Sequence, residues 1–262
     1  MVEEDLMSTD DWKRKLEQQE IESREYRHRI YKMIDLENMG KILDVGCGTG
    51  AVTRDIAQIT RGHVTGIDID QRKLERAEEY LVDLENVDLI HGNAQELAFG
   101  DGEFDLVIFH IVLLYIKDKQ KAVRECARVC KKGGLVVASL EPDYEGRLIY
   151  PEDPFREIQL RNARKLGADT KCGRKLQYLF KKAGLKTEVR LDQDTDYIHI
   201  KDPKKKLKMF VDNWWLQERM FWDTGWSNNE IEKYRKEMAS LIENGLLFDY
   251  PTAFYAIGRK LE

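Results

Sequence analysis

The sequence predicts an α/β fold built on a doubly wound parallel sheet. Short apolar runs alternate with charged, amphipathic segments between residues 41 and 193, which is the pattern of strands joined by crossover helices. The first run, Lys41–Val45, leads directly into glycines at 46, 48 and 50. Crossovers of this kind are right-handed and place helices on both faces of the sheet. Ligands of such sheets bind at the carboxyl ends of the strands.

Seven strands and several helices are expected in order along the chain. The strands are Lys41–Val45, His63–Ile67, Val87–His91, Phe104–Phe109, Leu135–Leu140, Leu185–Leu191 and Thr252–Arg259. The helices are Thr9–Leu36, Ala51–Ile59, a charged segment after Asp68, Lys119–Cys130, Phe155–Leu166 and Arg174–Ala183. The segment Glu141–Pro154 holds three of the five prolines and is expected to be an ordered loop.

The chain is expected to form one domain over residues 1–262. A helical segment at about 9–37 precedes a core at about 41–193 and 250–262, and a mostly helical insertion at about 200–247 forms a cap. Aromatic residues at helical spacing belong to cores more often than to ligand pockets, so most of those in the insertion are expected to pack together. They are Phe210, Trp214, Trp215, Phe221, Trp222 and Trp226.

Composition narrows the class of protein. The 262 residues are 42% hydrophobic and 35% charged, which suits one globular core, and the net charge of −5 argues against nucleic acid as a partner. No apolar stretch approaches the roughly 18 residues of a membrane span, and the acidic N-terminus does not resemble a signal peptide. The four cysteines follow no disulfide or zinc-ligand spacing. These features predict a cytoplasmic protein with no metal site.

A nucleotide-like cofactor is expected at the turn formed by the three glycines. Glycine reaches positive φ and lets a ligand approach the backbone, and the helix beginning at Ala51 would point its amide groups into the same site. Asp68 ends the second strand about twenty residues later, where a carboxylate accepts hydrogen bonds from ribose hydroxyls. The spacing of the glycines, followed by Ala51, also fits the pattern of dinucleotide-binding turns. The turn alone therefore does not decide which cofactor binds.

Five motifs narrow this choice. They are ILDVGCGTG, GIDID, GNAQELAF, FDLVIFH and KKGGLVVAS. In this order and at these intervals, the chain resembles the class I S-adenosylmethionine-dependent methyltransferases from about Tyr26 through Leu191, with the final strand at the C-terminus. The first motif is highly specific, and the others are specific only together. The resemblance implies a seven-stranded, mostly parallel sheet whose last strand is antiparallel, whereas dinucleotide folds normally end in parallel strands.

The resemblance implies S-adenosyl-L-methionine as the cofactor and a set of residues that bind it. They are Asp44, Gly46, Cys47, Gly48, Gly50, Asp68, Ile69, Asn93, Ala94 and His110. In the family the glycine turn passes under the methionine part, the acid at Asp68 holds the ribose, and Ile69 would pack on adenine. Asn93-Ala94 replaces the usual Asp near adenine, and Asn93 can offer its carbonyl to the exocyclic amine. Asp44 would orient the turn and the cofactor's amino group.

Catalytic groups are harder to predict, because the sulfonium of this cofactor carries the reactive methyl and the protein needs only to align an acceptor and exclude water. His110 could act as a base or simply wall the pocket. Glu141 could accept a proton and Tyr144 could contact the acceptor, or both could belong to a solvated loop. Cys47 is expected to be a small filler of the turn.

The expected function is methyl transfer to a small-molecule acceptor, because the two elaborations of the sheet could enclose the active site. The alternatives are a protein or RNA methyltransferase, an NAD-type oxidoreductase, and an inactive cofactor-binding module.

Overall fold

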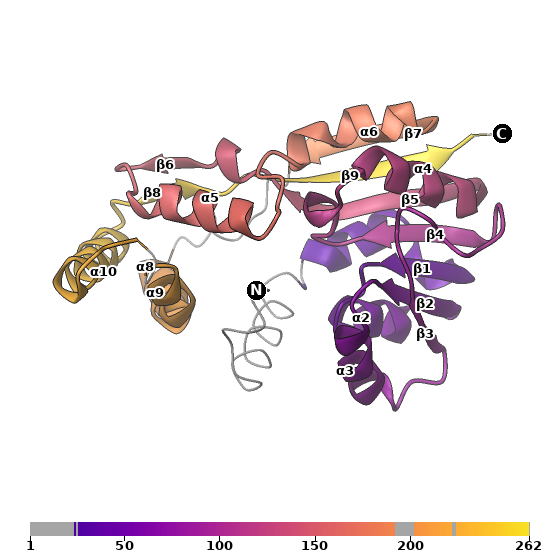
Figure 1. Ribbon diagram of the computed structural model, residues 1–262, viewed down its shortest axis with the longest axis horizontal. Helices are drawn as coiled ribbons and strands as arrows, with labels where there is room; N and C mark the ends of the chain where they lie inside the picture. Colours follow the sequence, from indigo (N-terminus) through magenta and orange to yellow (C-terminus); the bar gives the residue numbers. More distant parts are fainter. Residues whose placement is uncertain (1–23, 25, 192–201, 222–223, 262) are drawn as a thin grey trace. The chain divides into compact units, whose positions relative to one another are not determined.

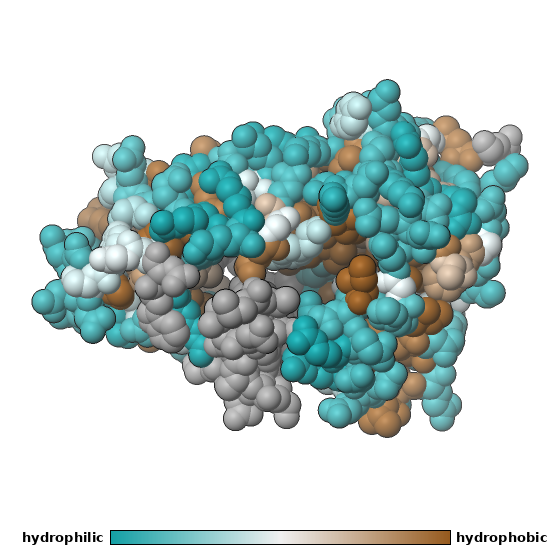
Figure 2. Space-filling view, viewed as in Figure 1, coloured by the Kyte–Doolittle hydropathy of each residue, from teal (hydrophilic) through white to brown (hydrophobic). Residues whose placement is uncertain are grey.

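The structure is a computed structural model that describes residues 24, 26–191, 202–221 and 224–261. The chain divides into two compact units (Figure 1). The first, here the sheet unit, comprises residues 1–142, 172–191 and 253–262, and the second, the helical unit, comprises 143–171 and 192–252. Hydrophilic side chains cover most of the visible face of each unit (Figure 2).

The sheet unit contains seven strands in the order β3-β2-β1-β4-β5-β9-β7. The strands are β1 (Lys41–Val45), β2 (His63–Asp68), β3 (Val87–His91), β4 (Phe104–Phe109), β5 (Cys130–Pro142), β7 (Leu185–Leu191) and β9 (Ala253–Lys260). The first five pair in parallel, and β9 lies antiparallel between β5 and β7. Strand order reverses between β1 and β4, so the switch point lies at their carboxyl ends. The predicted fold class, including its antiparallel last strand, is confirmed.

Helices cover the sheet where the amphipathic segments predict them. They are α2 (Ala51–Ile59), α3 (Gln71–Leu81), α4 (Lys119–Val129) and α6 (Leu176–Lys182), with 3-10 turns η2 (Leu36–Asn38), η3 (Leu113–Tyr115) and η5 (Gly173–Lys175). Asp70 and Asp118 begin α3 and α4, because their side chains accept hydrogen bonds from the first-turn N–H groups of Arg72 and Lys121. Of the helix expected at Thr9–Leu36, the described residues 24 and 26–33 are helical, and the rest up to residue 25 lies outside the described part.

One core cluster joins the N-terminal helical segment to the sheet. Its buried members include Ile30 and Ile34 of that segment, Ile42 of β1, Ile56 of α2 and Leu106 of β4. Beside this cluster, the Arg27 Nε donates to Asp55 Oδ2 at 3.0 Å, and the two side chains are 1% and 2% exposed. A buried charge is tolerated only with a partner. This pair therefore fixes where the N-terminal segment lies on α2.

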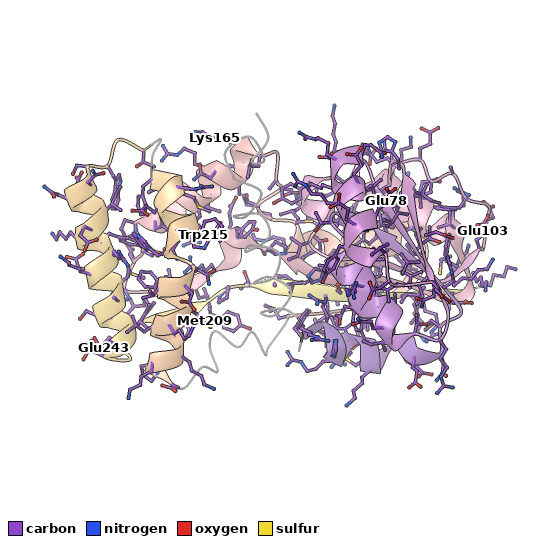
Figure 3. The ribbon with its side chains drawn as sticks, turned by 90° about the horizontal axis from the view of Figure 1, so that it is seen from below. Glu78, Glu103, Lys165, Met209, Trp215 and Glu243 are labelled. Carbon is purple, nitrogen blue, oxygen red and sulfur yellow. The ribbon has the colours of Figure 1, made fainter. Side chains whose placement is uncertain are left out.

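The described residues of the helical unit form a short 3-10 turn, four α-helices and a two-stranded sheet. They are η4 (Tyr144–Gly146), β6 (Leu148–Tyr150), α5 (Phe155–Lys165), α8 (Pro203–Asp212), α9 (Trp214–Phe221), α10 (Asn228–Glu243) and β8 (Phe248–Tyr250). Figure 3 shows Met209 on α8 and Trp215 on α9. The capping box at Ser227 and Glu230 begins α10.

Aromatic side chains form the core of the helical unit, as the sequence predicts. Phe210, Trp214 and Phe221 are buried, and Trp226 is partly buried against them. The ring centroids of Trp214 and Phe221 lie 6.1 Å apart. Of the other aromatics named from the sequence, Trp215 is half-buried, with the Arg219 guanidinium 5.8 Å from its ring, and Trp222 lies outside the described residues.

The segment Glu141–Pro154 is not the loop that its prolines predict. Glu141 and Pro142 end β5, and residues 148–150 form β6, which pairs with β8 in antiparallel register. Three-residue strands are too short to show the alternation that identifies a strand, and the partner of β6 lies about a hundred residues away. Neither feature is visible in the local sequence.

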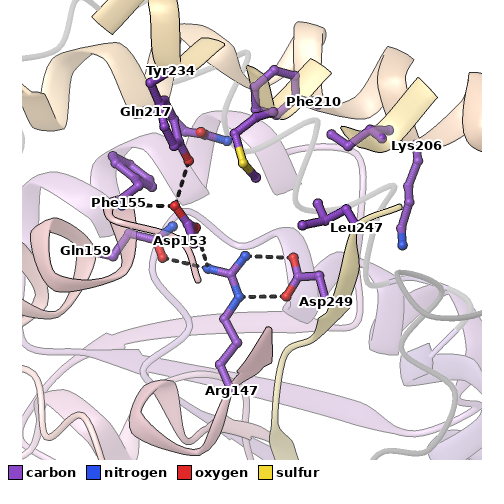
Figure 4. A pocket seen from close by; sticks show the side chains of 12 residues that line it. Arg147, Asp153, Phe155, Gln159, Lys206, Phe210, Gln217, Tyr234, Leu247 and Asp249 are labelled. Carbon is purple, nitrogen blue, oxygen red and sulfur yellow. Dashed lines mark hydrogen bonds and ion pairs between the residues drawn. The ribbon is translucent and has the colours of Figure 1, made fainter. Parts of the chain in front are cut away.

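A charged network holds the β6–β8 pair to the helices of its own unit (Figure 4). The Arg147 guanidinium donates to both oxygens of Asp249 at 2.7 and 2.6 Å and to Gln159 of α5 at 2.9 Å. Asp153 accepts from the Tyr234 hydroxyl of α10 at 2.9 Å. Bidentate pairs of this kind are strong and geometrically specific, so they define how the short strands dock.

We expect Asp249→Ala to destabilise the helical unit by about 3 kcal/mol, because it removes the bidentate partner of a largely buried guanidinium. Tryptophan fluorescence during urea denaturation measures this, since four of the five tryptophans lie at 214, 215, 222 and 226. Lys208→Ala is the matched control, because its pair with Asp212 is exposed and should contribute less than about 1 kcal/mol. Equal midpoints for the two variants would contradict the assignment.

Candidate cofactor site

The glycine turn lies at the switch point of the sheet. Its first two amides, those of Gly46 and Cys47, donate to the Ile67 carbonyl at the end of β2, at 2.7 and 3.0 Å. Gly46, Gly48 and Gly50 all have positive φ, at 74°, 56° and 87°. The chain therefore turns sharply from β1 across the end of β2 and enters α2, with Gly50 as the residue before that helix.

Gly46 and Gly48 are required for different reasons. A Cβ at Gly46 would lie 2.5 Å from Cγ1 of Val112, so the loop after β4 leaves it no room. A Cβ at Gly48 would meet nothing within 4 Å. Gly46 is therefore needed for packing within the protein, whereas the space over Gly48 is open to a ligand.

Asp68 connects the glycine turn to the end of β2. Its Oδ2 accepts a hydrogen bond from the Gly48 amide at 2.8 Å, and its Oδ1 accepts one from the Asp70 amide at 2.9 Å. An ionised carboxylate has about four lone-pair positions, so these two bonds leave capacity for hydroxyl groups. The half-buried side chain thus fixes the turn and can still bind a ribose.

The residues named for an adenine ring lie on the neighbouring strand ends. Ile69 follows β2, and its side chain is 66% exposed. His91 Nε2 lies 3.0 Å from the Ile69 carbonyl, so this nitrogen carries the hydrogen and holds Ile69 in place. Asn93 Oδ1 accepts from the backbone amide of Gln95 at 2.9 Å and from its side-chain amide at 3.4 Å, which fixes the loop through Ala94.

Asp44 is buried beneath the turn, with 1% of its surface exposed. Burial raises the pKa of its carboxyl to about 6, although the Thr53 hydroxyl donates to Oδ2 at 2.7 Å and lowers it. The negative charge of Asp68 also raises this pKa, and the positive charge of Arg27 lowers it. The carboxyl groups of Asp44 and Asp68 therefore lie close enough at the glycine turn to repel each other when both are ionised. A cation bound beside them would favour the ionised form of both.

His110 follows β4, and its neighbours define its tautomer. Its Nδ1 lies 2.9 Å from Ser139 Oγ, and that hydroxyl donates to the Phe109 carbonyl at 3.0 Å. Because the single hydroxyl hydrogen is used, Nδ1 must donate, and Nε2 then holds a lone pair. Burial of the ring, with a smaller contribution from Arg27, lowers the pKa of His110 to about 3. The imidazole is neutral at physiological pH and can accept a hydrogen bond through Nε2.

Cys47 fits the expectation of a small filler. It is 7% exposed, and its sulfur would lie 3.0 Å from a Cβ built at Gly66 of β2. Burial raises the pKa of its thiol well above the usual range, so it does not form the reactive thiolate.

Glu141 and Tyr144 have different surroundings. Glu141 ends β5 with no exposed surface, and its carboxylate accepts from three amides of the loop after β4, at Val112, Leu113 and Leu114. Burial raises its pKa to about 7, opposed by these bonds. Tyr144 belongs to the helical unit, lies in η4 and is 39% exposed. Proton transfer by Glu141 and acceptor contact by Tyr144 stay predictions.

The loop after β4 contains a strained residue. Ile111 has φ of 56°, a left-handed conformation that costs a non-glycine residue about 1–2 kcal/mol and is rarer still for a β-branched side chain. Its amide donates to the Leu140 carbonyl of β5 at 2.9 Å. Strain of this kind persists where the surrounding contacts determine the backbone, and it is common at ligand sites.

Three residues of the site are not among those predicted from the sequence. Thr53 supports Asp44 from the first turns of α2, Ser139 orients His110 from β5, and Val112 packs on Gly46. Thr53 lies close to the glycine turn in the chain, so a search for hydroxyls early in α2 could have found it. The other two become neighbours only through the pairing of β1, β4 and β5.

Comparison with known proteins agrees with this geometry. Residues 43–138, which include the glycine turn and the ends of the first four strands, match the family described as Methyltransferase domain. This segment is a methyltransferase domain. The resemblance to the class I methyltransferases that the five motifs predict is confirmed, and the antiparallel β9 is the feature that separates this fold from dinucleotide-binding ones.

Relatives and solved structures extend the comparison. A demethylmenaquinone methyltransferase from Staphylococcus aureus is 40% identical over 114 residues, which are 43% of this chain and 47% of that protein. The chain therefore matches about half the length of this curated relative. Phosphoethanolamine N-methyltransferase 2 from Haemonchus contortus, solved with S-adenosyl-L-methionine, has a TM-score of 0.60 at 18% identity, covering 91% of this chain and 53% of that one. The cyclase SpnF has a TM-score of 0.60 at 18% identity, covering 91% of this chain and 81% of that one. At these identities the structures show the fold alone.

No cluster of three or more His, Cys, Asp or Glu side chains in the described part could hold a metal ion. None of the described helices combines the length and the apolar character needed to cross a membrane.

We expect Gly46→Ala and Gly48→Ala to separate folding from binding in the methyltransferase domain. Gly48→Ala should cost about 1–2 kcal/mol of stability, from its left-handed backbone alone, but weaken S-adenosylhomocysteine binding at least about tenfold. Gly46→Ala should cost a further 1–3 kcal/mol or so, because its Cβ meets Val112. Urea denaturation and titration calorimetry measure the two quantities. Unchanged affinity in a folded Gly48→Ala variant would contradict the placement of a ligand over Gly48.

Proposed function

We propose that the chain is an S-adenosyl-L-methionine-dependent methyltransferase that acts on a small-molecule acceptor. The observation that carries this proposal is the pair of carboxyl groups at the glycine turn, buried Asp44 and half-buried Asp68. The charge of Asp68 raises the pKa of Asp44, so further negative charge beside the turn is unfavourable. The cofactor carries a sulfonium and an amino group and is cationic overall, whereas the pyrophosphate of a dinucleotide is anionic. Two carboxylates favour the cation.

Each residue of the site then has a role that its geometry allows. Asp68 accepts hydrogen bonds from the ribose hydroxyls while it holds the Gly48 amide, and the exposed Ile69 covers one face of the adenine. Asn93 Oδ1 accepts from the exocyclic amine in place of the Gln95 side-chain amide, whose hydrogen bond to this oxygen is long at 3.4 Å. Asp44 balances the charge of the cofactor's amino group. The bound cofactor would supply the electrophilic methyl, and the chain would supply alignment and exclusion of water.

His110 is proposed as a hydrogen-bond acceptor in the pocket wall. A base with a pKa of about 3 removes protons poorly at neutral pH, and efficient general bases have pKa values near the working pH. The Ser139 hydroxyl instead keeps the Nε2 lone pair available for a donor on the cofactor or acceptor. This role is the second of the two that the sequence suggests for His110, a residue of the pocket wall.

A small acceptor and a reducing compartment are supported by separate observations. The relative with a matching domain is named for demethylmenaquinone, a small molecule, and the chain has a net charge of −5, which disfavours nucleic acid. A protein acceptor is the second candidate, and the labelling experiment below tests it together with small molecules. All four cysteines are buried free thiols, which is typical of cytoplasmic proteins.

Methyl transfer from labelled S-adenosyl-L-methionine to pools of quinones, phenols and amines tests the proposal. Binding alone is insufficient, because the cyclase SpnF shares this fold. We expect binding of S-adenosylhomocysteine, no binding of NADH, and label in at least one small-molecule pool. Tight NADH binding without S-adenosylhomocysteine binding would overturn the proposal, and label found only in protein would overturn the choice of acceptor.

We expect cofactor binding to release a proton when measured near pH 5.5. Because the empty site holds the Asp44 carboxyl protonated up to about pH 6, binding of a cation beside it lowers this pKa and drives ionisation. Affinity should therefore be constant above about pH 7 and fall as the pH drops below 6. Calorimetry in buffers with different ionisation enthalpies counts the protons released.

Asp44→Asn is the control for this experiment, since it keeps an acceptor for Thr53 but cannot ionise. It should abolish the proton release and lower the affinity at pH 7.5 by about tenfold, which corresponds to about 1.4 kcal/mol. Equal proton release by the variant and the wild type would show that another group is responsible.

A further inference from the structure

The carboxylate of Glu141 holds the loop after β4 by three consecutive backbone amides. Oε1 accepts from Val112 at 3.0 Å and from Leu113 at 2.9 Å, and Oε2 accepts from Leu114 at 3.3 Å. The Cys172 thiol adds a hydrogen bond to the same carboxyl. Both oxygens are therefore occupied by protein donors, and the residue has no exposed surface. A group with this environment is suited to holding backbone rather than exchanging protons with a substrate.

The loop that Glu141 holds would not keep its shape by local preference. Ile111, the residue before the three amides, has φ of 56°, which side chains branched at Cβ strongly disfavour. Its own amide is fixed to the Leu140 carbonyl, one residue before Glu141. Four successive amides, from Ile111 to Leu114, are thus bound to the end of β5. This set of bonds outweighs the unfavourable backbone conformation.

The same loop closes one side of the glycine turn. Val112, whose amide Glu141 holds, places both methyl groups within 2.6 Å of where a Cβ of Gly46 would lie. Gly46 is the residue at which the chain leaves β1, and its amide bonds to Ile67 across the sheet. Displacement of Val112 would leave the turn without its packing partner on that side.

We propose that Glu141 is a positioning residue for the cofactor site, which presses Val112 against Gly46 and so keeps the glycine turn in its binding conformation. The proposal rests on the proposed function, because it assigns the turn to S-adenosyl-L-methionine. Glu141 acts through the loop and touches neither cofactor nor acceptor. It therefore affects cofactor affinity and the KM for the cofactor, and kcat at saturating cofactor much less.

Glu141→Gln and Val112→Ala test the two ends of this connection. The Gln side chain keeps the shape of Glu but has one oxygen that accepts and one NH₂ group that donates. The NH₂ group would face a backbone N–H, and two donors cannot form a hydrogen bond. Val112→Ala removes the methyl groups that pack on Gly46. We expect at least tenfold weaker S-adenosylhomocysteine binding for Glu141→Gln and at least fivefold weaker binding for Val112→Ala. The double variant should bind no more than about twofold weaker than Glu141→Gln alone, since both changes break one connection.

Asp105→Asn is the matched control. Asp105 also accepts a backbone amide, that of Lys41 at 2.8 Å, but at the amino ends of β1 and β4, the edge opposite the glycine turn. It should lower the thermal midpoint without changing S-adenosylhomocysteine affinity by more than about twofold. This separates positioning of the site from general loss of stability.

The outcomes distinguish this proposal from the proposed function. If the wild type does not bind S-adenosylhomocysteine, the proposed function fails. If the wild type binds and Glu141→Gln or Val112→Ala binds equally well, or their effects multiply in the double variant, the positioning role is overturned. A fall in kcat with unchanged KM for the cofactor also overturns it. Should Glu141→Gln not fold, Val112→Ala alone decides, because it leaves all the hydrogen bonds of the loop in place.

Discussion

The backbone of the glycine turn is enclosed by the protein on several sides, and the arrangement of the site depends on this enclosure. The Ile67 carbonyl binds two amides of the turn, the Asp68 carboxylate binds a third, and Val112 fills the space over Gly46. These three groups come from β2 and from the loop after β4. Since parallel strands bring these ends to one edge of the sheet, the turn acquires its conformation from tertiary contacts, and glycine is needed where they leave no room.

Electrostatics links the N-terminal helical segment to this turn. Arg27 is paired with Asp55 in the core, yet its charge lowers the pKa of both Asp44 and His110. The guanidinium therefore offsets part of the cost of burying Asp44, and it adds to the larger effect of burial that keeps His110 neutral. A buried cation near the Asp44 carboxyl stabilises its ionised form without outweighing the effect of burial.

The sequence predicts most strand positions to within a residue, because buried parallel strands are short apolar runs between turn residues. It also predicts Gly48 and Asp68, whose chemistry follows from their spacing along the chain. It does not predict β6 and β8, which are three residues long, nor the pairing of Ser139 with His110, which are 29 residues apart. Such contacts depend on strand register, and register is set by the whole sheet.

Glu141 illustrates why residue type alone does not identify the role of an acid. A carboxylate at the catalytic end of a strand could accept a proton, hold a ligand or bind backbone, and the sequence is the same in each case. What separates these roles is the set of donors around the two oxygens. Here three amides of one loop converge on a carboxyl with no exposed surface, and the loop that they fix packs on the glycine turn. Because its lone pairs are already directed at the protein, its contribution to the site passes through the backbone, by way of Val112 and Gly46.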